Sequence, residues 1–336
     1  MATSGIELSL SPSIKLPAVS VVLPVLNEEL HLANAVNSIL SQDYSGPLEV
    51  ILALGPSKDK TNQIAKNLAS SDSRITLVEN PSGRTAAGLN AAINKSKNPI
   101  IVRVDAHSEL QENYISQAIE VMKSSGAVNV GGIMGAEGKT LFEKTVAAAM
   151  RSPLGVGASR FHTGGEAGYV DTVYLGVFLR SAVIAVGGFD ERFIRAQDWE
   201  LNYRLRQAGG TVFFDPRLHV TYRPRSTAKA LAKQYFEYGR WRRVVSRRHQ
   251  GTINYRYLAP PFALIGTALS VVLASLINSI LIIPASIYGI FLILASLITG
   301  KGITEKLLLP FVLFTMQMSW GLGFLTSPKT LAPSKG

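Results

Sequence analysis

Pro99-Ile-Ile-Val-Arg-Val-Asp-Ala-His107 is the stretch that decides the fold of this chain. Its β-branched run from Ile100 to Val104 is typical of a buried parallel strand. The run stops at Asp105 and His107, whose side chains project to the same side of an extended backbone. Ligands of open α/β sheets bind at the carboxyl ends of strands, and a carboxylate with an imidazole can hold a divalent cation. The stretch therefore predicts an α/β sheet with a candidate metal site.

Similar strand-like runs recur on both sides of this stretch and alternate with helical segments. Strands alternating with helices of about ten residues predict βαβ units and a mainly parallel sheet. The Gly- and Ala-rich region 130–170 fits neither pattern, and we expect it to form a mobile loop beside a cleft. The predicted strands are 19–25, 48–54, 75–78 and 100–104, and the predicted helices are 29–40, 59–68, 85–93 and 112–122.

The composition excludes several kinds of site and limits the number of domains. The 336 residues are enough for one large domain and a smaller additional region. Cysteine is absent, which excludes disulfides, thiolate zinc sites and a Cys nucleophile. The net charge of +11 favours anionic lipid, phosphorylated substrates or nucleic acid as partners. Residues 1–17 lack the pattern of a signal peptide, so we expect a mobile tail that begins in the cytoplasm.

The last third of the chain is apolar. Residues 258–298 carry no charge and are long enough for two membrane crossings, and 307–325 are long enough for a third. The alternative is a buried helical bundle. Basic residues precede the first crossing and also lie between the second and the third crossing. By the positive-inside rule, both of these basic stretches are expected in the cytoplasm. We therefore expect a multi-pass cell-membrane protein with transmembrane helices over 258–326, a cytoplasmic catalytic domain and an outside C-terminal tail, 327–336.

A basic segment, 226–257, precedes the apolar region. Ser226 is a suitable N-cap for an amphipathic helix over 227–245. Its arginines suit anionic lipid, and its aromatic side chains suit the headgroup layer. The alternative is a nucleic-acid patch. We prefer lipid and no nucleic acid, because the segment directly abuts a membrane segment.

Two further segments carry polar residues at the start of a predicted helix. Asn27-Glu28 follows the first strand and could bind a ribose or base edge, or could simply begin a helix. Asp198, in Gln197-Asp-Trp-Glu-Leu-Asn-Tyr-Arg204, could cap a helix or act as a general base. Taken singly, neither segment decides between its two interpretations.

Together, in this order and spacing, the three segments resemble family 2 glycosyltransferases of the GT-A fold. The resemblance covers about residues 19–241. It is closest to bacterial exopolysaccharide glycosyltransferases of the succinoglycan-biosynthesis type, which share the Asp-Ala-His motif, a segment like Asp171-Thr-Val-Tyr-Leu-Gly176 and a C-terminal membrane part. It implies a GT-A domain over 18–225 that moves a sugar from a nucleotide-sugar donor to a lipid-linked or glycan acceptor in exopolysaccharide biosynthesis, with inversion.

The resemblance also implies roles for individual residues. Asp198 matches the catalytic base, and Asp105 and His107 occupy the motif for Mg²⁺ or Mn²⁺. A divalent cation would stabilise the charge that develops on the leaving nucleoside diphosphate. The residues that would bind the donor are Pro24, Asn27, Glu28, Arg84, Asn90 and Asp105. Those that would face the acceptor and the membrane are Gln197, Gln234, Arg240 and Trp241.

The chain departs from the family pattern in two places. Leu54 stands where many members carry an Asp that binds uracil, so the identity of the nucleotide is open. Gln234 is spaced more widely from Arg240-Trp241 than in the Gln-x-x-Arg-Trp motif of processive members, so we expect single sugar addition. Two alternatives stay open: a non-catalytic sugar-nucleotide-binding scaffold, and a transferase that uses a polyprenyl-phosphate sugar donor.

Overall fold

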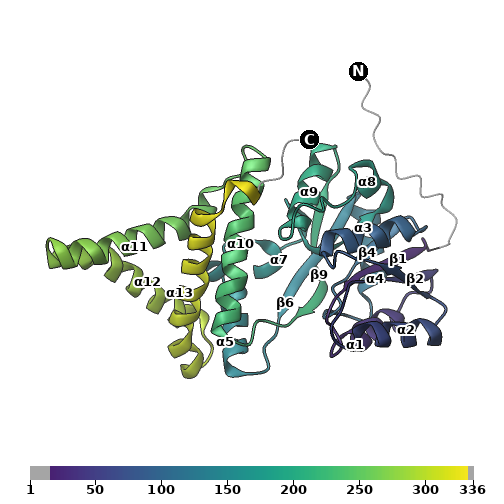
Figure 1. The fold of residues 1–336 in the computed structure, drawn as a ribbon, viewed down its shortest axis with the longest axis horizontal. Helices are drawn as coiled ribbons and strands as arrows, with labels where there is room; N and C mark the ends of the chain where they lie inside the picture. Colours follow the sequence, from purple (N-terminus) through teal and green to yellow (C-terminus); the bar gives the residue numbers. More distant parts are fainter. Residues whose placement is uncertain (1–15, 332–336) are drawn as a thin grey trace, which may run out of the picture. The chain divides into compact units, whose positions relative to one another are not determined.

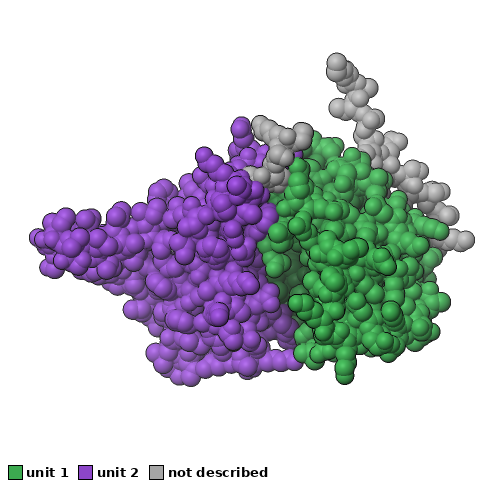
Figure 2. All heavy atoms as spheres, in the orientation of Figure 1, with its two compact units in different colours: residues 1–135, 164–222 green, residues 136–163, 223–336 purple. Residues whose placement is uncertain are grey.

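A computed structural model describes residues 16–331 and divides the chain into two compact units, coloured separately in Figure 2. The first unit takes in the chain up to Gly135 and Gly164–Tyr222, and the second takes in Ala136–Thr163 and the chain from Arg223 onward. Residues 1–15 of the expected N-terminal tail and 332–336 of the expected C-terminal tail lie outside the described residues.

The first half of the sheet follows the predicted βαβ pattern. β1 (Val19–Val25) pairs in parallel with β2 (Leu48–Leu54) and β4 (Ile100–Arg103), and β2 pairs in parallel with β3 (Ile75–Glu79). These four strands agree with the sequence to within one residue at each end. The intervening helices are α1 (Leu32–Leu40), α2 (Thr61–Ser71), α3 (Thr85–Lys95) and α4 (Tyr114–Ser125).

The second half of the sheet is antiparallel. β8 (Tyr174–Leu179) pairs with β4 on one side and β6 (Asn129–Ala136) on the other. β9 (Val212–Tyr222) then pairs with the short strands β5 (Glu109–Leu110) and β7 (Gly168–Tyr169). The order of the main path is β3-β2-β1-β4-β8-β6-β9-β5, which confirms the expected mixed α/β sheet. Two helices complete this unit, α8 (Arg180–Ala185) and α9 (Gln197–Gln207).

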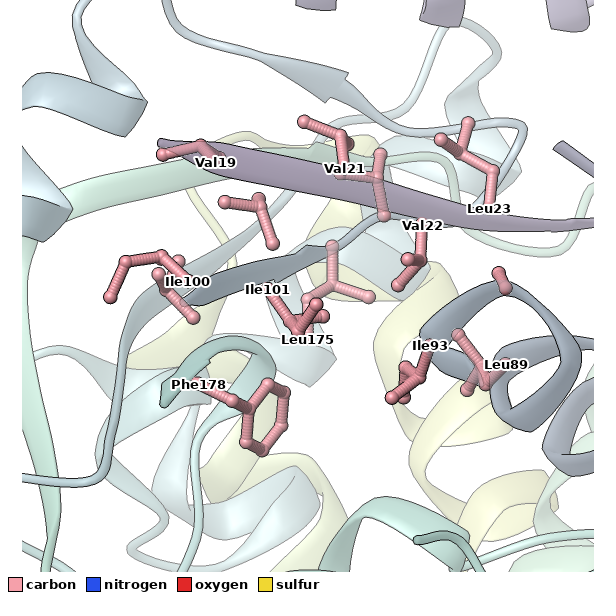
Figure 3. Packing of buried hydrophobic residues seen from close by; sticks show 14 of the residues in the cluster. Val19, Val21, Val22, Leu23, Leu89, Ile93, Ile100, Ile101, Leu175 and Phe178 are labelled. Atoms are coloured by element: carbon pink, nitrogen blue, oxygen red, sulfur yellow. The ribbon is translucent and has the colours of Figure 1, made fainter. Parts of the chain in front are cut away.

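The core of the first unit lies on the strands that the sequence marked as β-branched. Figure 3 shows side chains of β1, β4 and α3 packed together, with Phe178 of β8 beside them. Val21, Val22 and Ile101 have no exposed surface. Because complete burial of such a side chain stabilises a fold by about 1.5–3 kcal/mol, these strands are held firmly and their carboxyl ends are fixed.

The expectation of a mobile loop over 130–170 is wrong. The region begins with β6 and continues as three helices of the second unit, α5 (Leu141–Met150), α6 (Pro153–Val156) and α7 (Arg160–Thr163). Thr140 and Glu143 form a reciprocal capping box that starts α5. The Ala-rich sequence of α5 lacks the strong apolar stripe by which helices are recognised, which explains why the pattern missed it.

The rest of the second unit is helical (Figure 1). α10 (Ala228–Arg248) covers the predicted basic helix, with Thr227 rather than Ser226 as the N-cap. α11 (Ala259–Leu276), α12 (Ile283–Thr299) and α13 (Ile303–Thr326) follow, joined by short 3₁₀ turns and loops. With their flanking turns, these three helices are each long and apolar enough to cross a membrane.

α10 and α13 cross at two glycines. A Cβ on Gly239 would overlap the carbonyl oxygen of Trp320, and a Cβ on Gly323 would overlap the carbonyl oxygen of Phe236. The hydroxyl of Ser327 donates to the Arg240 carbonyl near the same crossing. The two backbones therefore approach as closely as only glycine permits.

We expect Gly239→Ala to destabilise the second unit, because the added methyl group must push the two helices apart. Overpacking of this kind costs about 1–3 kcal/mol. Gly289→Ala on α12 is the matched control, since a Cβ there meets nothing. Thermal unfolding in detergent should show a lower midpoint for Gly239→Ala alone, and equal midpoints for the two variants would contradict the close crossing.

Candidate active site

The candidate site is built on one buried arginine. The Arg103 side chain, at the end of β4, is only 4% exposed. Its Nη2 lies 3.1 Å from Oδ1 of Asp105, and its Nε lies 3.2 Å from Oδ1 of Asp198. Two carboxylates that the sequence singled out separately therefore contact the same guanidinium group.

Burial and charge set the protonation of this cluster. Burial raises the pKa of Asp198 to about 6; the positive charge of Arg103 opposes this rise and the negative charge of Asp105 adds to it. The Asp198 side chain keeps 26% of its surface exposed, although its Oδ1 is buried. Burial also raises the pKa of the neighbouring Tyr174 hydroxyl, which keeps that group protonated. Asp198 is thus a partly exposed carboxylate that titrates closer to neutral pH than an ordinary Asp.

Hydrogen bonds hold α9, and with it Asp198, against the sheet and the preceding loop. The Arg204 guanidinium donates to the carbonyls of Val186 (2.6 Å) and Gly188 (2.8 Å) and forms an ion pair with Glu200. On the buried face, the Asn202 amide donates to Thr172 (2.8 Å) and accepts from Asn129 (2.7 Å). These contacts fix the orientation of the helix that carries the candidate base.

The loop after β1 is fixed by bonds to the loop after β2. The backbone N–H of Asn27 donates to the Ser57 hydroxyl (3.0 Å), and the backbone N–H of Lys58 donates to Oδ1 of the Asn27 side chain (2.8 Å). The Glu28 N–H donates to the Thr61 hydroxyl (2.7 Å). Asn27 and Glu28 are therefore held next to the carboxyl ends of β1 and β2.

Glu28 also contacts the proposed metal motif, since its Oε1 lies 2.8 Å from Nδ1 of His107. Histidine ligands usually donate one ring N–H to a carboxylate and bind metal with the other nitrogen. Within residues 16–331, no three His, Asp or Glu side chains converge as a complete metal site. A cation held by Asp105 and His107 would need further ligands, which Mg²⁺ commonly takes from phosphate oxygens.

The other predicted donor residues have different surroundings. Pro24 lies partly buried in β1, beside Gly88 of α3. Arg84 is exposed at the start of α3. The Asn90 amide donates to the Phe189 carbonyl (2.8 Å) and to Glu191 (2.9 Å), and its oxygen accepts from the Phe189 N–H. Asn90 thus holds the loop before α9, a role that its position in the sequence did not reveal.

The four predicted acceptor-side residues divide between the two units. Gln197 is buried in the first unit, next to Asp198. Gln234, Arg240 and Trp241 belong to α10 of the second unit. Arg240 and Trp241 both contact Glu237, at 3.3 and 3.2 Å, and Gln234 donates to the Tyr238 hydroxyl at 3.0 Å.

Sequence reasoning missed Arg103, although the quoted stretch contains it. A charged residue inside an apolar strand was the available signal, because a buried arginine needs partners. Backbone strain occurs next to the same site. Among residues 16–331, the non-glycine residues with positive φ are Asn27, Leu175 and Ala196. Each lies within two residues of Glu28, Tyr174 or Asp198, as is common at functional sites.

Comparison with known proteins identifies the family of this chain. The family model "Glycosyl transferase family 2" matches residues 20–187, half of the chain. The chain belongs to glycosyltransferase family 2. The matched region contains β1 to β4, β6 and β8, and therefore Glu28, Arg103, Asp105 and His107.

Two curated relatives extend the similarity beyond the matched domain. The succinoglycan biosynthesis protein ExoA of Rhizobium meliloti is 29% identical over 313 residues, which cover 90% of this chain and 93% of that protein. A dolichyl N-acetyl-α-D-glucosaminyl phosphate 3-β-D-2,3-diacetamido-2,3-dideoxy-β-D-glucuronosyltransferase of Methanococcus voltae is 25% identical over 288 residues, covering 82% and 88%. This glycosyltransferase thus resembles an exopolysaccharide-biosynthesis protein along most of its length.

Among solved structures, the mannosyltransferase PcManGT of Pyrobaculum calidifontis, in complex with GDP-Man and Mn²⁺, superposes with a TM-score of 0.58. The sequences are 18% identical, and the match covers 95% of this glycosyltransferase and 90% of that chain. The similarity supports a GT-A fold, as expected from the sequence.

Proposed function

We propose that this glycosyltransferase moves a sugar from a nucleotide-sugar donor to a lipid-linked acceptor, with inversion, at the cytoplasmic face of the cell membrane. The observation that carries the proposal is the contact of Arg103 with both Asp105 and Asp198. This contact joins the carboxylates of Asp105 and Asp198 to one group at the carboxyl end of β4, which supports a shared role for them in the reaction.

Asp198 acts as the general base in this proposal. Its carboxylate takes the proton of the acceptor hydroxyl as that oxygen forms a bond to the anomeric carbon. The bond from that carbon to the diphosphate breaks at the same time, and the nucleoside diphosphate leaves. One displacement from the face opposite the leaving group inverts the anomeric configuration. Arg103 keeps the base oriented and favours its ionised form.

Asp105 and His107 would hold a divalent cation together with the donor phosphates. The cation would supply positive charge for the leaving diphosphate. Glu28 orients His107 through the 2.8 Å contact with Nδ1, and would so support a bound metal without binding it.

Glu28→Gln is therefore expected to raise the Mn²⁺ concentration that gives half-maximal activity by about 10–100-fold, the usual effect of losing a carboxylate behind a histidine ligand. Turnover at saturating Mn²⁺ should fall much less. Glu29→Gln is the matched control, because its carboxylate bonds the Lys60 N–H and not His107. An unchanged Mn²⁺ requirement in Glu28→Gln would contradict this role for Glu28.

The pKa of Asp198 predicts the acid limb of the pH profile. Because the base must be ionised, kcat/KM should fall about tenfold for each pH unit below about 6 and stay level above it, until another group titrates. Circular dichroism at each pH would show that the protein stays folded. A rate that stays constant from pH 7 to 4.5 would contradict the assignment of the base.

The similar proteins support the substrate classes. The neighbour PcManGT was solved with GDP-Man and Mn²⁺, and the Methanococcus voltae relative is named for a dolichyl-phosphate-linked sugar. These names favour a nucleotide-sugar donor and a lipid-linked acceptor. Leu54, in place of the family's uracil-binding Asp, gives no preference for uridine. The basic helix α10 fits anionic membrane lipid as a further partner.

Turnover with a panel of donors tests the proposal. Detergent-purified protein would receive Mn²⁺, a bacterial lipid extract and uridine, guanosine or thymidine diphosphate sugars in turn. We expect lipid-dependent release of one nucleoside diphosphate and recovery of the sugar in the lipid fraction. Nucleotide binding without any product would support the scaffold alternative, and transfer only from a polyprenyl-phosphate sugar would replace the nucleotide donor.

A further inference from the structure

Helices α10 and α13 of the second unit run side by side (Figure 1). Beyond the glycine crossing they continue in the same direction, because Arg243 lies over the Phe324 ring at 5.0 Å and Arg247 donates to the carbonyls of Ser327 and Pro328. α13 therefore has α10 as a neighbour over its last two turns and at its end. If this part of α13 lies in the hydrocarbon of a membrane, the middle of α10 lies there too.

The sequence of α10 argues against a crossing. Its middle holds the Glu237–Arg240 ion pair, and charged residues occur from its first turn to its last. The charged residues of α10 are Lys229, Lys233, Glu237, Arg240, Arg242, Arg243, Arg247 and Arg248. Charged side chains at the centre of a bilayer are strongly unfavourable, whereas a helix rich in Lys and Arg suits the layer of anionic headgroups.

The exposed surface of α13 has the pattern of a helix that lies in the interface. The large apolar residues it exposes recur at steps of three, four and eight residues, which places them on one stripe along the whole helix. They are Ile303, Leu307, Phe311, Phe314, Leu322 and Leu325. Most buried residues of α13, such as Leu313, Met316 and Gly323, lie on other faces, whereas Gly321 is buried on the stripe against Pro260.

α11 and α12 have the opposite character. They form a hairpin that reaches away from α10 and α13 (Figure 1), and their apolar side chains are exposed on most sides. No charged residue occurs between Arg256 and Lys301. Both ends of the hairpin return to α13: Pro260 lies against Gly321, and the Ser296 hydroxyl donates to the Lys306 carbonyl. These two contacts lie toward opposite ends of α13, so a hairpin that enters and leaves the membrane on one side requires α13 to lie along the membrane surface.

We infer that the α11–α12 hairpin alone enters the hydrocarbon, and that α13 lies beside α10 in the headgroup layer with its apolar stripe against the acyl chains. α13 then forms no third crossing, although its length and composition would permit one. Short connections join the two units at Gly135–Ala136, Thr163–Gly164 and Tyr222–Arg223, so the catalytic unit and α10 share one side of the membrane. Lys329, after α13, then lies on this side as well.

The absence of native cysteine makes single-cysteine labelling a clean test. Thr330→Cys, just after α13, and Lys123→Cys, in the catalytic unit, both replace exposed residues. With a membrane-impermeant maleimide, we expect both to be labelled only after spheroplasts are permeabilised. A host protein with an outward-facing cysteine controls for reagent activity. Labelling of Thr330→Cys in sealed spheroplasts, with Lys123→Cys protected, would overturn the inference.

Depth measurements give a second test that does not depend on sidedness. Nitroxides would be attached to cysteines at Leu307, Phe314 and Leu325, which are 75%, 44% and 45% exposed, in protein reconstituted into vesicles. The depth of each nitroxide is obtained from the ratio of its collisions with oxygen and with a polar nickel chelate. If α13 lies in the interface, the three depths should be similar and shallow. A helix that crosses the bilayer predicts that Phe314 is by far the deepest, and this result would overturn the inference. Neither test depends on the proposed reaction.

Discussion

Asp198→Asn is expected to lower turnover by about 10²–10⁴-fold, the usual contribution of a general base. The carboxamide has nearly the same shape as the carboxylate, so α9 should keep its bonds to the loop at 186–188. It cannot accept a proton from the acceptor hydroxyl at neutral pH. Donor affinity, measured by titration calorimetry with the nucleotide, should stay within a few-fold of the affinity of the wild-type protein.

Asp171→Asn is the matched control for this variant. Its carboxylate is 73% exposed and pairs with Arg206, near the other end of α9. We expect nearly full turnover from it. If Asp198→Asn retained turnover comparable to that of Asp171→Asn, Asp198 would not be the base.

Arg103→Met is expected to destabilise the protein by about 3–5 kcal/mol, the usual cost of removing one partner from a buried ion pair. The methionine side chain fills much of the same space, but it leaves Asp105 and Asp198 without their shared positive charge. The pKa of Asp198 should then rise further, because burial and Asp105 both raise it and Arg103 opposes them. The acid limb of the pH profile should move to higher pH by the same amount.

Arg74→Met provides the comparison. Arg74 pairs with Asp72 on an exposed surface, where an ion pair contributes about 0–1 kcal/mol. Thermal unfolding in detergent should separate the two variants clearly. Equal melting temperatures, with an unshifted pH profile in Arg103→Met, would show that Arg103 does not hold the site together.

The sequence predicted the strands well where burial dictates residue type. β1 to β4 appear as β-branched runs because both faces of a parallel strand are covered. α5 escaped prediction, because an Ala-rich segment carries little periodic contrast. The placement of 136–163 with the C-terminal helices depends on tertiary contacts that no local pattern records, such as the Gln317 amide that donates to the Leu154 carbonyl.

The site was predictable in its residue types but not in its contacts. Asp105, His107 and Asp198 were recognisable as strand-end and helix-start polar residues. That Arg103 joins two of them depends on where α9 docks, far along the chain from β4. The contact of Glu28 with His107 likewise requires β1 and β4 to be neighbours in the sheet, which the order of strands along the chain does not specify.

The anomeric configuration of the product tests the central claim most directly. With the donor identified, a sugar labelled with ¹³C at the anomeric carbon would be transferred and its configuration read by NMR before and after the reaction. Direct displacement assisted by Asp198 predicts a product with the opposite configuration to that of the donor. Retention would contradict the account, because a single displacement with a general base cannot produce it.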